Sequence, residues 1–271
     1  MTFFIEKTSS HSQARAGVLE TPHGCIRTPV FMPVGTQATV KGVLPEQLVA
    51  LGAQIILANT YHLALQPGSD HVQAHGGLHA FMNWPRPILT DSGGYQVFSL
   101  QSNCQIKETG VLFRSHRDGS AQWFDFKTVI NHQLKLGSDI MMPLDICTPY
   151  GASYAQTAAD LAITHRWESD ACAYWQACET PQLLFGLVQG GMHADLRRRS
   201  VATLCSQPFS GFAIGGVSVG EPLDEMHRII QTVTPLLPAE KPRYIMGIGL
   251  PENLETAIHA GADMFDCVLP T

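Results

Sequence analysis

The sequence has 271 residues, 45% apolar and 15% charged, which is enough for one large globular domain with a substantial core. Its formal charge of −6 and pI of about 6.0 argue against the extended basic face of a nucleic-acid binder, although a local basic patch stays compatible with them. The seven scattered cysteines contain no C-x-x-C pair, which argues against a disulfide framework and favours a reducing cytoplasm. No segment approaches the ~20 apolar residues of a membrane span. The single basic run, Arg197, Arg198 and Arg199, could form such a basic patch, and a solvated helix face explains it equally well.

Residues 1–30 alternate short apolar runs with turn residues, which predicts a β-hairpin ahead of the main fold. Eight short apolar runs, each just before a Gly, Asn or Asp, are then predicted to be strands: residues 30–34, 55–58, 88–89, 140–142, 183–187, 212–214, 244–246 and 264–268. Helical spacing of apolar residues follows most of them, most clearly in residues 44–51, 129–136, 158–177, 196–204, 226–233 and 254–260.

Eight strands that alternate with helices indicate an α/β fold, a closed (β/α)8 TIM barrel rather than an open sheet. Residues 101–122 interrupt the alternation, and their spacing predicts a hairpin inserted after the third strand. The eighth strand ends at Pro270, where a complete barrel would need a further helix of ~12 residues. We therefore expect residues 1–271 to form a single barrel domain that is truncated at its C-terminus and lacks the last helix.

The stretch ILTDSGGYQVFSL, residues 88–100, places Asp91 at the carboxyl end of a short strand, where barrels hold their working groups. Gly93 and Gly94 follow, and they let the backbone approach a ligand without a Cβ in the way. Paired glycines after an aspartate are equally typical of an ordinary turn. The ends of the other strands help to choose between these interpretations.

Those ends carry further polar or flexible groups, which converge at one mouth of a barrel: Asn59, Asp145, Gln189, Gly216, Met246 and Asp266. Two carboxylates can act on a glycosidic bond, while a third carboxylate, an amide and stacking side chains can bind a planar base. Asp145 could instead cap a turn, and Gln189 could belong to a plain turn. Asp266 is harder to explain structurally, because a carboxylate inside an apolar strand costs free energy without partners. His62 is interpreted as a structural histidine.

Seven motifs, in order and across nearly the whole chain, resemble those of tRNA-guanine transglycosylases (queuine tRNA-ribosyltransferases): NTYHL, TDSGGYQVFSL, DICTPY, VQGG, GGVSVGE, MGIG and DMFDCVLPT. The resemblance implies a barrel enzyme of queuosine biosynthesis, acting as a cytoplasmic homodimer. Such an enzyme exchanges guanine at the wobble position of tRNAs with a G-U-N anticodon for a 7-deazaguanine. The exchange runs through a covalent nucleoside–enzyme intermediate. Cys147 and Val219 resemble the bacterial branch, which inserts preQ1.

The resemblance also implies roles for single residues. Asp266 matches the nucleophile on the ribose, and Asp91 matches the general acid/base, with Ser92 beside it. The resemblance assigns reading of the base to Asp145, Gln189 and the Gly216 backbone, and stacking on the base to Tyr95 and Met246. Val217, supported by Glu221, matches the residue that contacts the substituent of the incoming base. Asn59 and Gln96 match the residues that orient the acid/base and the ribose.

Two features depart from the family pattern. Ile146 stands where bacterial members commonly carry Glu, and we expect this difference to alter how the site handles its substrates. Family members also continue past FDCVLPT into a subdomain that holds zinc on three cysteines and one histidine and helps to grip tRNA. Zinc is therefore expected for the full-length family member, with its ligands absent from this chain.

Four alternatives stay open from the sequence. An inactive fragment, or a non-catalytic tRNA-binding partner subunit, would fit the missing region. A glycoside hydrolase or an aldolase on the same barrel would fit the fold, since barrels host many chemistries. An aldolase would use a lysine at a strand end, and only Lys41 is close to one.

Overall fold

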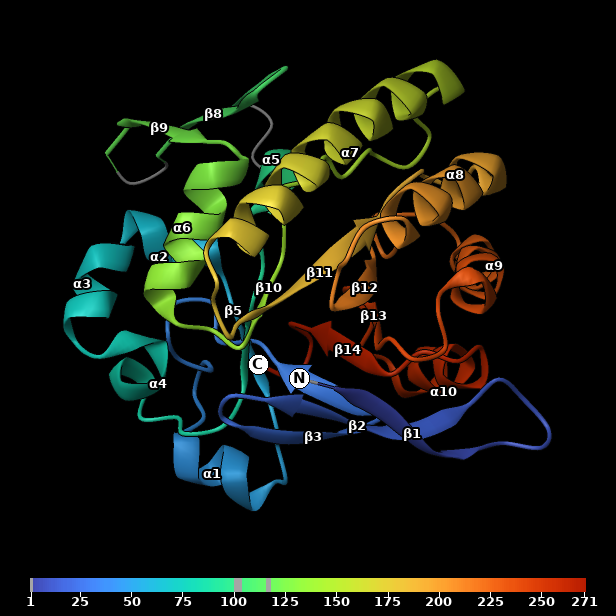
Figure 1. The fold of residues 1–271 in the computed structure, drawn as a ribbon, viewed down its shortest axis with the longest axis horizontal. Helices are drawn as coiled ribbons and strands as arrows, with labels where there is room; N and C mark the ends of the chain where they lie inside the picture. Colours follow the sequence, from blue (N-terminus) through green and yellow to red (C-terminus); the bar gives the residue numbers. More distant parts are fainter. Residues whose placement is uncertain (1, 100–103, 116–117) are drawn as a thin grey trace.

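The computed structural model describes residues 2–99, 104–115 and 118–271 (Figure 1). All eight predicted barrel strands are confirmed: β4 (Val30–Pro33), β5 (Ile56–Ala58), β6 (Ile88–Thr90), β10 (Ile140–Met141), β11 (Leu183–Val188), β12 (Gly211–Ile214), β13 (Arg243–Ile245) and β14 (Met264–Cys267). They form one parallel sheet in the order β4-β14-β13-β12-β11-β10-β6-β5. A parallel bridge between Val34 and Leu57 joins the two edges, so the sheet closes into the predicted (β/α)8 barrel.

Helices surround the barrel: α1 (Pro45–Ala50), α2 (Thr60–Leu65), α3 (Ser69–Ala74), α4 (Gly77–Met82), α5 (Gly94–Ser99), α6 (Phe126–Leu136), α7 (Tyr154–Ala177), α8 (Ala194–Cys205), α9 (Leu223–Val233) and α10 (Pro251–His259), with a 3-10 turn at Thr234–Leu236. The six helices expected from apolar spacing are confirmed. Short helices α2 to α5 were not predicted. Residues 268–271, after β14, contain no further helix.

The N-terminal segment forms three antiparallel strands rather than two, β1 (Phe3–Thr8), β2 (Arg15–Thr21) and β3 (Gly24–Thr28), seen in blue in Figure 1. Phe3, Leu19 and Ile26 pack into the same apolar cluster as the inward side chains of the barrel. Arg15 also donates to Asp263, which directly precedes β14, at 2.9 and 2.5 Å. This sheet therefore covers the amino ends of the barrel strands and leaves the carboxyl ends open.

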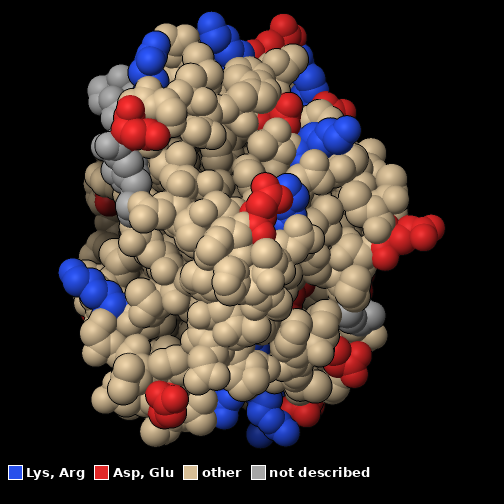
Figure 2. Space-filling model, turned by 90° about the vertical axis from the view of Figure 1, so that its left-hand side faces the viewer, with Lys and Arg blue, Asp and Glu red and all other residues tan. Residues whose placement is uncertain are grey.

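The predicted insertion after the third barrel strand is also a three-stranded antiparallel sheet: β7 (Cys104–Lys107), β8 (Gly110–Arg114) and β9 (Ala121–Phe124). Residues 101–103 and 116–117 of that prediction lie outside the described residues. On the face in Figure 2, acidic and basic side chains are interspersed among a majority of uncharged ones. Within the described part of the chain, no helix is both long and apolar enough to cross a bilayer.

Candidate active site

A cavity of about 640 Å³ opens at the carboxyl ends of the barrel strands. The parallel strands all end there, so the segments that follow them meet although they are far apart in sequence. The cavity is lined by all twelve residues expected from the sequence: Asn59, Asp91, Ser92, Tyr95, Gln96, Asp145, Gln189, Gly216, Val217, Glu221, Met246 and Asp266. His62, set aside as structural, lines it as well.

Asp91 follows β6 directly and is held by three donors. Its Oδ1 accepts from the backbone N–H groups of Thr60 (3.0 Å) and Gly93 (3.3 Å), and its Oδ2 accepts from Asn59 Nδ2 (2.6 Å). Burial raises the pKa of Asp91 to about 7, and the nearby charge of Asp266 adds to the rise, while the three donors oppose it. At neutral pH this carboxyl is therefore present in both protonation states, as a general acid/base requires.

Asn59 connects the start of α2 to this carboxylate. Its Oδ1 accepts from the backbone N–H of His62 at 3.0 Å, which caps the helix. Its Nδ2 donates both to Asp91 and, at 3.2 Å, to Gln96 Oε1. The amide is thus fixed at both ends, and it orients Asp91 and Gln96 toward each other.

Asp266 lies in the last barrel strand, and its carboxylate is only partly buried. Oδ1 accepts from the hydroxyl of Tyr244 at 2.6 Å and from the backbone N–H of Gly247 at 2.9 Å. Burial raises the pKa of Asp266, and these two donors hold it down. Tyr244 was missed from the sequence, although a phenol at the start of the predicted apolar strand 244–246 was a usable signal.

The third carboxylate, Asp145, is buried beside an amide and a hydroxyl. Its Oδ2 accepts from Gln189 Nε2 at 2.8 Å, and its Oδ1 accepts from Ser92 Oγ at 3.3 Å. Burial raises the pKa of Asp145 to about 6. A Cβ on Gly94 would lie 1.9 Å from Asp145 Oδ1, and one on Gly216 would lie 2.4 Å from Gln189 Oε1. A side chain at either position would therefore displace the Asp145 carboxylate or the Gln189 amide.

The segment that follows β12 is stabilised by its own carboxylate. Glu221 accepts from the backbone N–H groups of Ser218 and Val219, the latter at 2.8 Å. Ser218 has φ +60°, a conformation that costs free energy outside glycine, so the carboxylate holds a strained turn. Val217, whose carbonyl was expected to contact the incoming base, lies within this turn and is buried.

Arg197 contradicts the interpretation of residues 197–199 as a solvated helix face. Its neighbours Arg198 and Arg199 are exposed, but Arg197 on α8 is fully buried. Its guanidinium donates to four backbone carbonyls at 2.7–3.0 Å: Val188, Gly191, Gly215 and Gly216. Burial lowers its pKa to about 10, so the side chain stays charged. Helical spacing places Arg197 on the same buried face of α8 as Val201 and Leu204, so the apolar period was a usable signal for its burial.

Two residues around Asp145 differ in their relation to the cavity. Ile146 does not line it but packs with Leu144 and Trp167 in an apolar cluster. Any influence of Ile146 on substrates is therefore indirect. Cys147 does line the cavity, and burial raises the pKa of its thiol to about 12, so the thiol stays protonated at neutral pH.

Among the described residues, one group of three or more His, Cys, Asp or Glu side chains is close enough to share a metal ion: His23, His79 and Asp139. It contains no cysteine. These three residues therefore do not fit the zinc set of three cysteines and one histidine that the family resemblance implies.

A closed parallel barrel with a cavity that holds three carboxylates at the carboxyl ends of its strands defines a (β/α)8-barrel enzyme. A family model described as queuine tRNA-ribosyltransferase matches residues 9–271. The chain belongs to this family of transferases.

Proteins named queuine tRNA-ribosyltransferase are similar to it along almost its whole length. The one from Herpetosiphon aurantiacus is 54% identical over 262 residues, which cover 97% of this chain and 66% of the relative. Those from Halalkalibacterium halodurans and Natranaerobius thermophilus are each 54% identical over 271 residues, which cover 100% of this chain and 71% and 73% of the relatives. The chain therefore spans about two thirds to three quarters of the length of these relatives.

Proposed function

We propose that this chain exchanges guanine at the wobble position of tRNAs with a G-U-N anticodon for the 7-deazaguanine preQ1. The observation that carries the proposal is the pair of carboxylates at one cavity, Asp266 in β14 and Asp91 after β6. One is held by Tyr244 and a backbone N–H, and the other has a pKa near 7. The proposal includes a homodimer that works in the cytoplasm.

In the first half of the reaction, a carboxylate oxygen of Asp266 attacks C1′ of the ribose. The bond from C1′ to guanine breaks, and protonated Asp91 gives its proton to the leaving base. This step yields a covalent aspartyl–ribose ester, free guanine and an ionised Asp91. In the second half, Asp91 takes a proton from preQ1, whose nitrogen attacks C1′ and releases the Asp266 carboxylate.

The base is held by the second group of side chains. Asp145 accepts from the N–H groups on the Watson–Crick edge of guanine or preQ1, and Gln189 and the Gly216 backbone lie beside it in the free protein. Tyr95, which is 55% exposed at the cavity, and Met246 supply stacking surfaces. Because guanine and preQ1 share that edge, one set of groups serves both halves of the reaction.

The test is an exchange assay with labelled guanine and unmodified tRNA, with and without preQ1. We expect labelled guanine to enter the tRNA without preQ1 and to be displaced from it when preQ1 is added. We also expect a denaturant-resistant protein–tRNA adduct that Asp266→Asn abolishes. An adduct at wild-type yield in Asp266→Asn would assign the bond to another residue. Release of guanine without any second base would indicate hydrolysis. Binding of tRNA without adduct or exchange would favour a non-catalytic partner subunit, against which the three intact carboxylates argue.

A further inference from the structure

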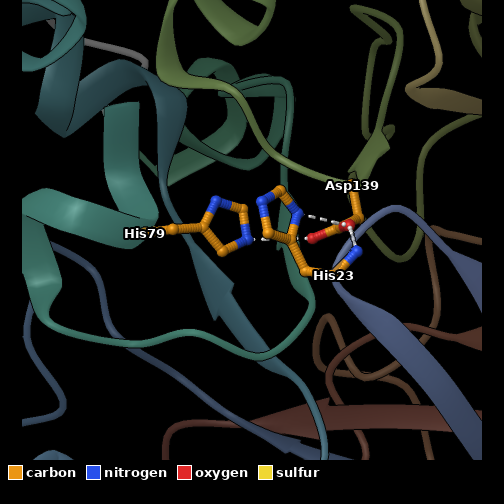
Figure 3. A group of neighbouring side chains, drawn as sticks. All are labelled: His23, His79 and Asp139. Atoms are coloured by element: carbon orange, nitrogen blue, oxygen red, sulfur yellow. Dashed lines mark hydrogen bonds and ion pairs between the residues drawn. The ribbon is translucent and has the colours of Figure 1, made fainter. Parts of the chain in front are cut away.

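A second cluster of polar side chains lies at the other end of the barrel from the cavity (Figure 3). His23 belongs to the turn between β2 and β3, His79 lies on α4, and Asp139 directly precedes β10. The amino ends of the barrel strands are the ends that the N-terminal sheet covers. The cluster therefore connects three distant segments of the chain at the end of the barrel that the N-terminal sheet covers.

Asp139 is fully buried and accepts four hydrogen bonds. Oδ1 accepts from the backbone N–H (3.0 Å) and ring Nδ1 (2.9 Å) of His23, and Oδ2 accepts from the backbone N–H of Ile88 (2.8 Å) and ring Nε2 of His79 (3.0 Å). Burial by itself would raise the pKa of Asp139, but the bonds from His79, Ile88 and His23 hold it below its ordinary value. The carboxylate is ionised, and two backbone groups fix its orientation.

The two imidazole rings stack on each other, with centroids 3.5 Å apart and planes inclined by 17°. The side chain of His79 is 11% exposed and that of His23 is 40% exposed. His79 is therefore held in place, whereas the ring of His23 has room to turn on its solvent side.

We propose that His23, His79 and Asp139 form a binding site for a divalent transition-metal cation of the Zn²⁺ type. Two neutral imidazoles and one carboxylate are a donor set that Zn²⁺, Co²⁺ and related ions prefer over Mg²⁺ or Ca²⁺. The backbone donors to Asp139 act as the outer shell that orients a ligating carboxylate. Water fills the remaining positions on the exposed side of His23.

The distances support a shared ion. Ligand atoms about 2.1 Å from one metal lie roughly 3.0–3.4 Å apart when their bond angles are near 90–110°. The two imidazole nitrogens already lie 2.9 and 3.0 Å from the Asp139 oxygens, and one ligand atom from each of the three residues lies within 4.8 Å of the other two. Parallel rings cannot both point a lone pair at one ion, so the ring of His23 turns when the ion binds. The ion replaces two N–H···O bonds and joins the N-terminal sheet to the barrel.

The site is tested by titrating Co²⁺ into the metal-free chain under reducing conditions. We expect one saturable Co²⁺ per chain, with ligand-field bands and without the strong near-ultraviolet absorption of thiolate–cobalt bonds. His79→Gln should weaken this binding at least tenfold. Exposed His71 and His75 on α3 could also hold a metal, so the double variant His71→Gln/His75→Gln is the matched control and should change the affinity less than twofold.

A second measurement is the melting temperature with and without Zn²⁺, which should rise for the wild type and the control but not for His79→Gln. If His79→Gln does not fold, an anomalous difference map from wild-type crystals soaked in Co²⁺ is the test, and we expect a peak between His79 and Asp139. The proposal is overturned by an absent peak, by binding that survives His79→Gln, or by a thiolate band. It is equally overturned if the melting temperature is the same with and without metal, which would show that the three side chains only form hydrogen bonds that stabilise the fold.

Discussion

The hydroxyl of Tyr244 lies 2.6 Å from Oδ1 of Asp266 and donates to it, from β13 to the neighbouring strand β14. A hydrogen bond to an ionised carboxylate favours the charged form. In this barrel it opposes the rise in pKa that burial gives Asp266. Tyr244 therefore favours the ionised form of the proposed nucleophile.

Tyr244→Phe should slow adduct formation by about 10–100-fold, because hydrogen bonds to charged groups contribute roughly 1.5–3 kcal/mol. Without the donor the pKa of Asp266 rises, so the acid limb of the pH–rate profile should move to higher pH. Single-turnover adduct formation measured from pH 5 to pH 9 checks this. Tyr174→Phe is the control, since that hydroxyl donates to Asn131 away from the cavity. An unchanged acid limb in Tyr244→Phe would separate Tyr244 from the nucleophile.

Asp91→Ala should reduce turnover by roughly 10²–10⁴, the usual contribution of general acid–base catalysis. The sign of the pH dependence follows from the pKa near 7. The acid form that protonates leaving guanine prevails below pH 7, so adduct formation in the wild type should fall above that pH, and the variant should lose this limb. A loss of less than tenfold would remove Asp91 from the role.

Asp145→Ala should weaken the binding of free guanine and of preQ1 together, because each would leave N–H groups unpaired at a cost of about 1–3 kcal/mol. Inhibition constants of both bases measure the effect. Asp160→Ala is the matched control: Asp160 is a buried carboxylate that accepts from Thr148 and Gln156 and does not line the cavity. Equal constants in wild type and Asp145→Ala would contradict base recognition by this residue.

Gly94→Ala should imitate Asp145→Ala, since the new methyl group would lie 1.9 Å from Asp145 Oδ1 and displace it. The two substitutions should therefore not be additive in a double-mutant cycle on guanine binding. Gly35→Ala is the control, because its methyl group would lie 3.3 Å from the flexible end of Met82 and at ordinary contact distances, 3.4 and 3.5 Å, from the backbone of Thr39 and Leu57. Additive losses would mean that Gly94 acts independently of Asp145.

The barrel was predictable because a strand buried on both faces is a continuous apolar run between turn residues, and β11 is buried at every position. Helices α2 to α4 were not predicted, and with six residues each they make fewer than two turns, which gives apolar periodicity little length to show. Local backbone features set their ends instead, such as the Asn59 cap of α2 and the left-handed Gly76 before α4.

The convergence of the twelve cavity residues was predictable because barrel topology brings strand ends together whatever their separation in sequence. The hydrogen bonds that hold those residues in place were not predictable. Tyr244 acts through a residue 22 positions away, and Arg197 bonds only to backbone carbonyls, which have no sequence signature. His23 and Asp139 meet across 116 positions because the N-terminal sheet covers the barrel, a packing that no local pattern encodes.

Arg197 should be necessary for the shape of the base-binding region. Its guanidinium joins the segment after β11, through the carbonyls of Val188 and Gly191, to the segment after β12, through those of Gly215 and Gly216. Arg197→Met leaves these buried acceptors without a donor, at about 1–3 kcal/mol for each one that water does not reach. We expect the free energy of unfolding to fall by at least roughly 3 kcal/mol, and guanine affinity to fall as Gln189 and Gly216 lose their support.

Arg197→Lys should recover only part of both losses, because an ammonium group has three donors and lacks the planar fork of a guanidinium. Urea unfolding and guanine inhibition constants measure the two effects separately. Exposed Arg198→Met removes the same charge from the next position of α8 and should change neither quantity appreciably. Full affinity in a folded Arg197→Met variant would show that the segments after β11 and β12 keep their positions without the guanidinium between them.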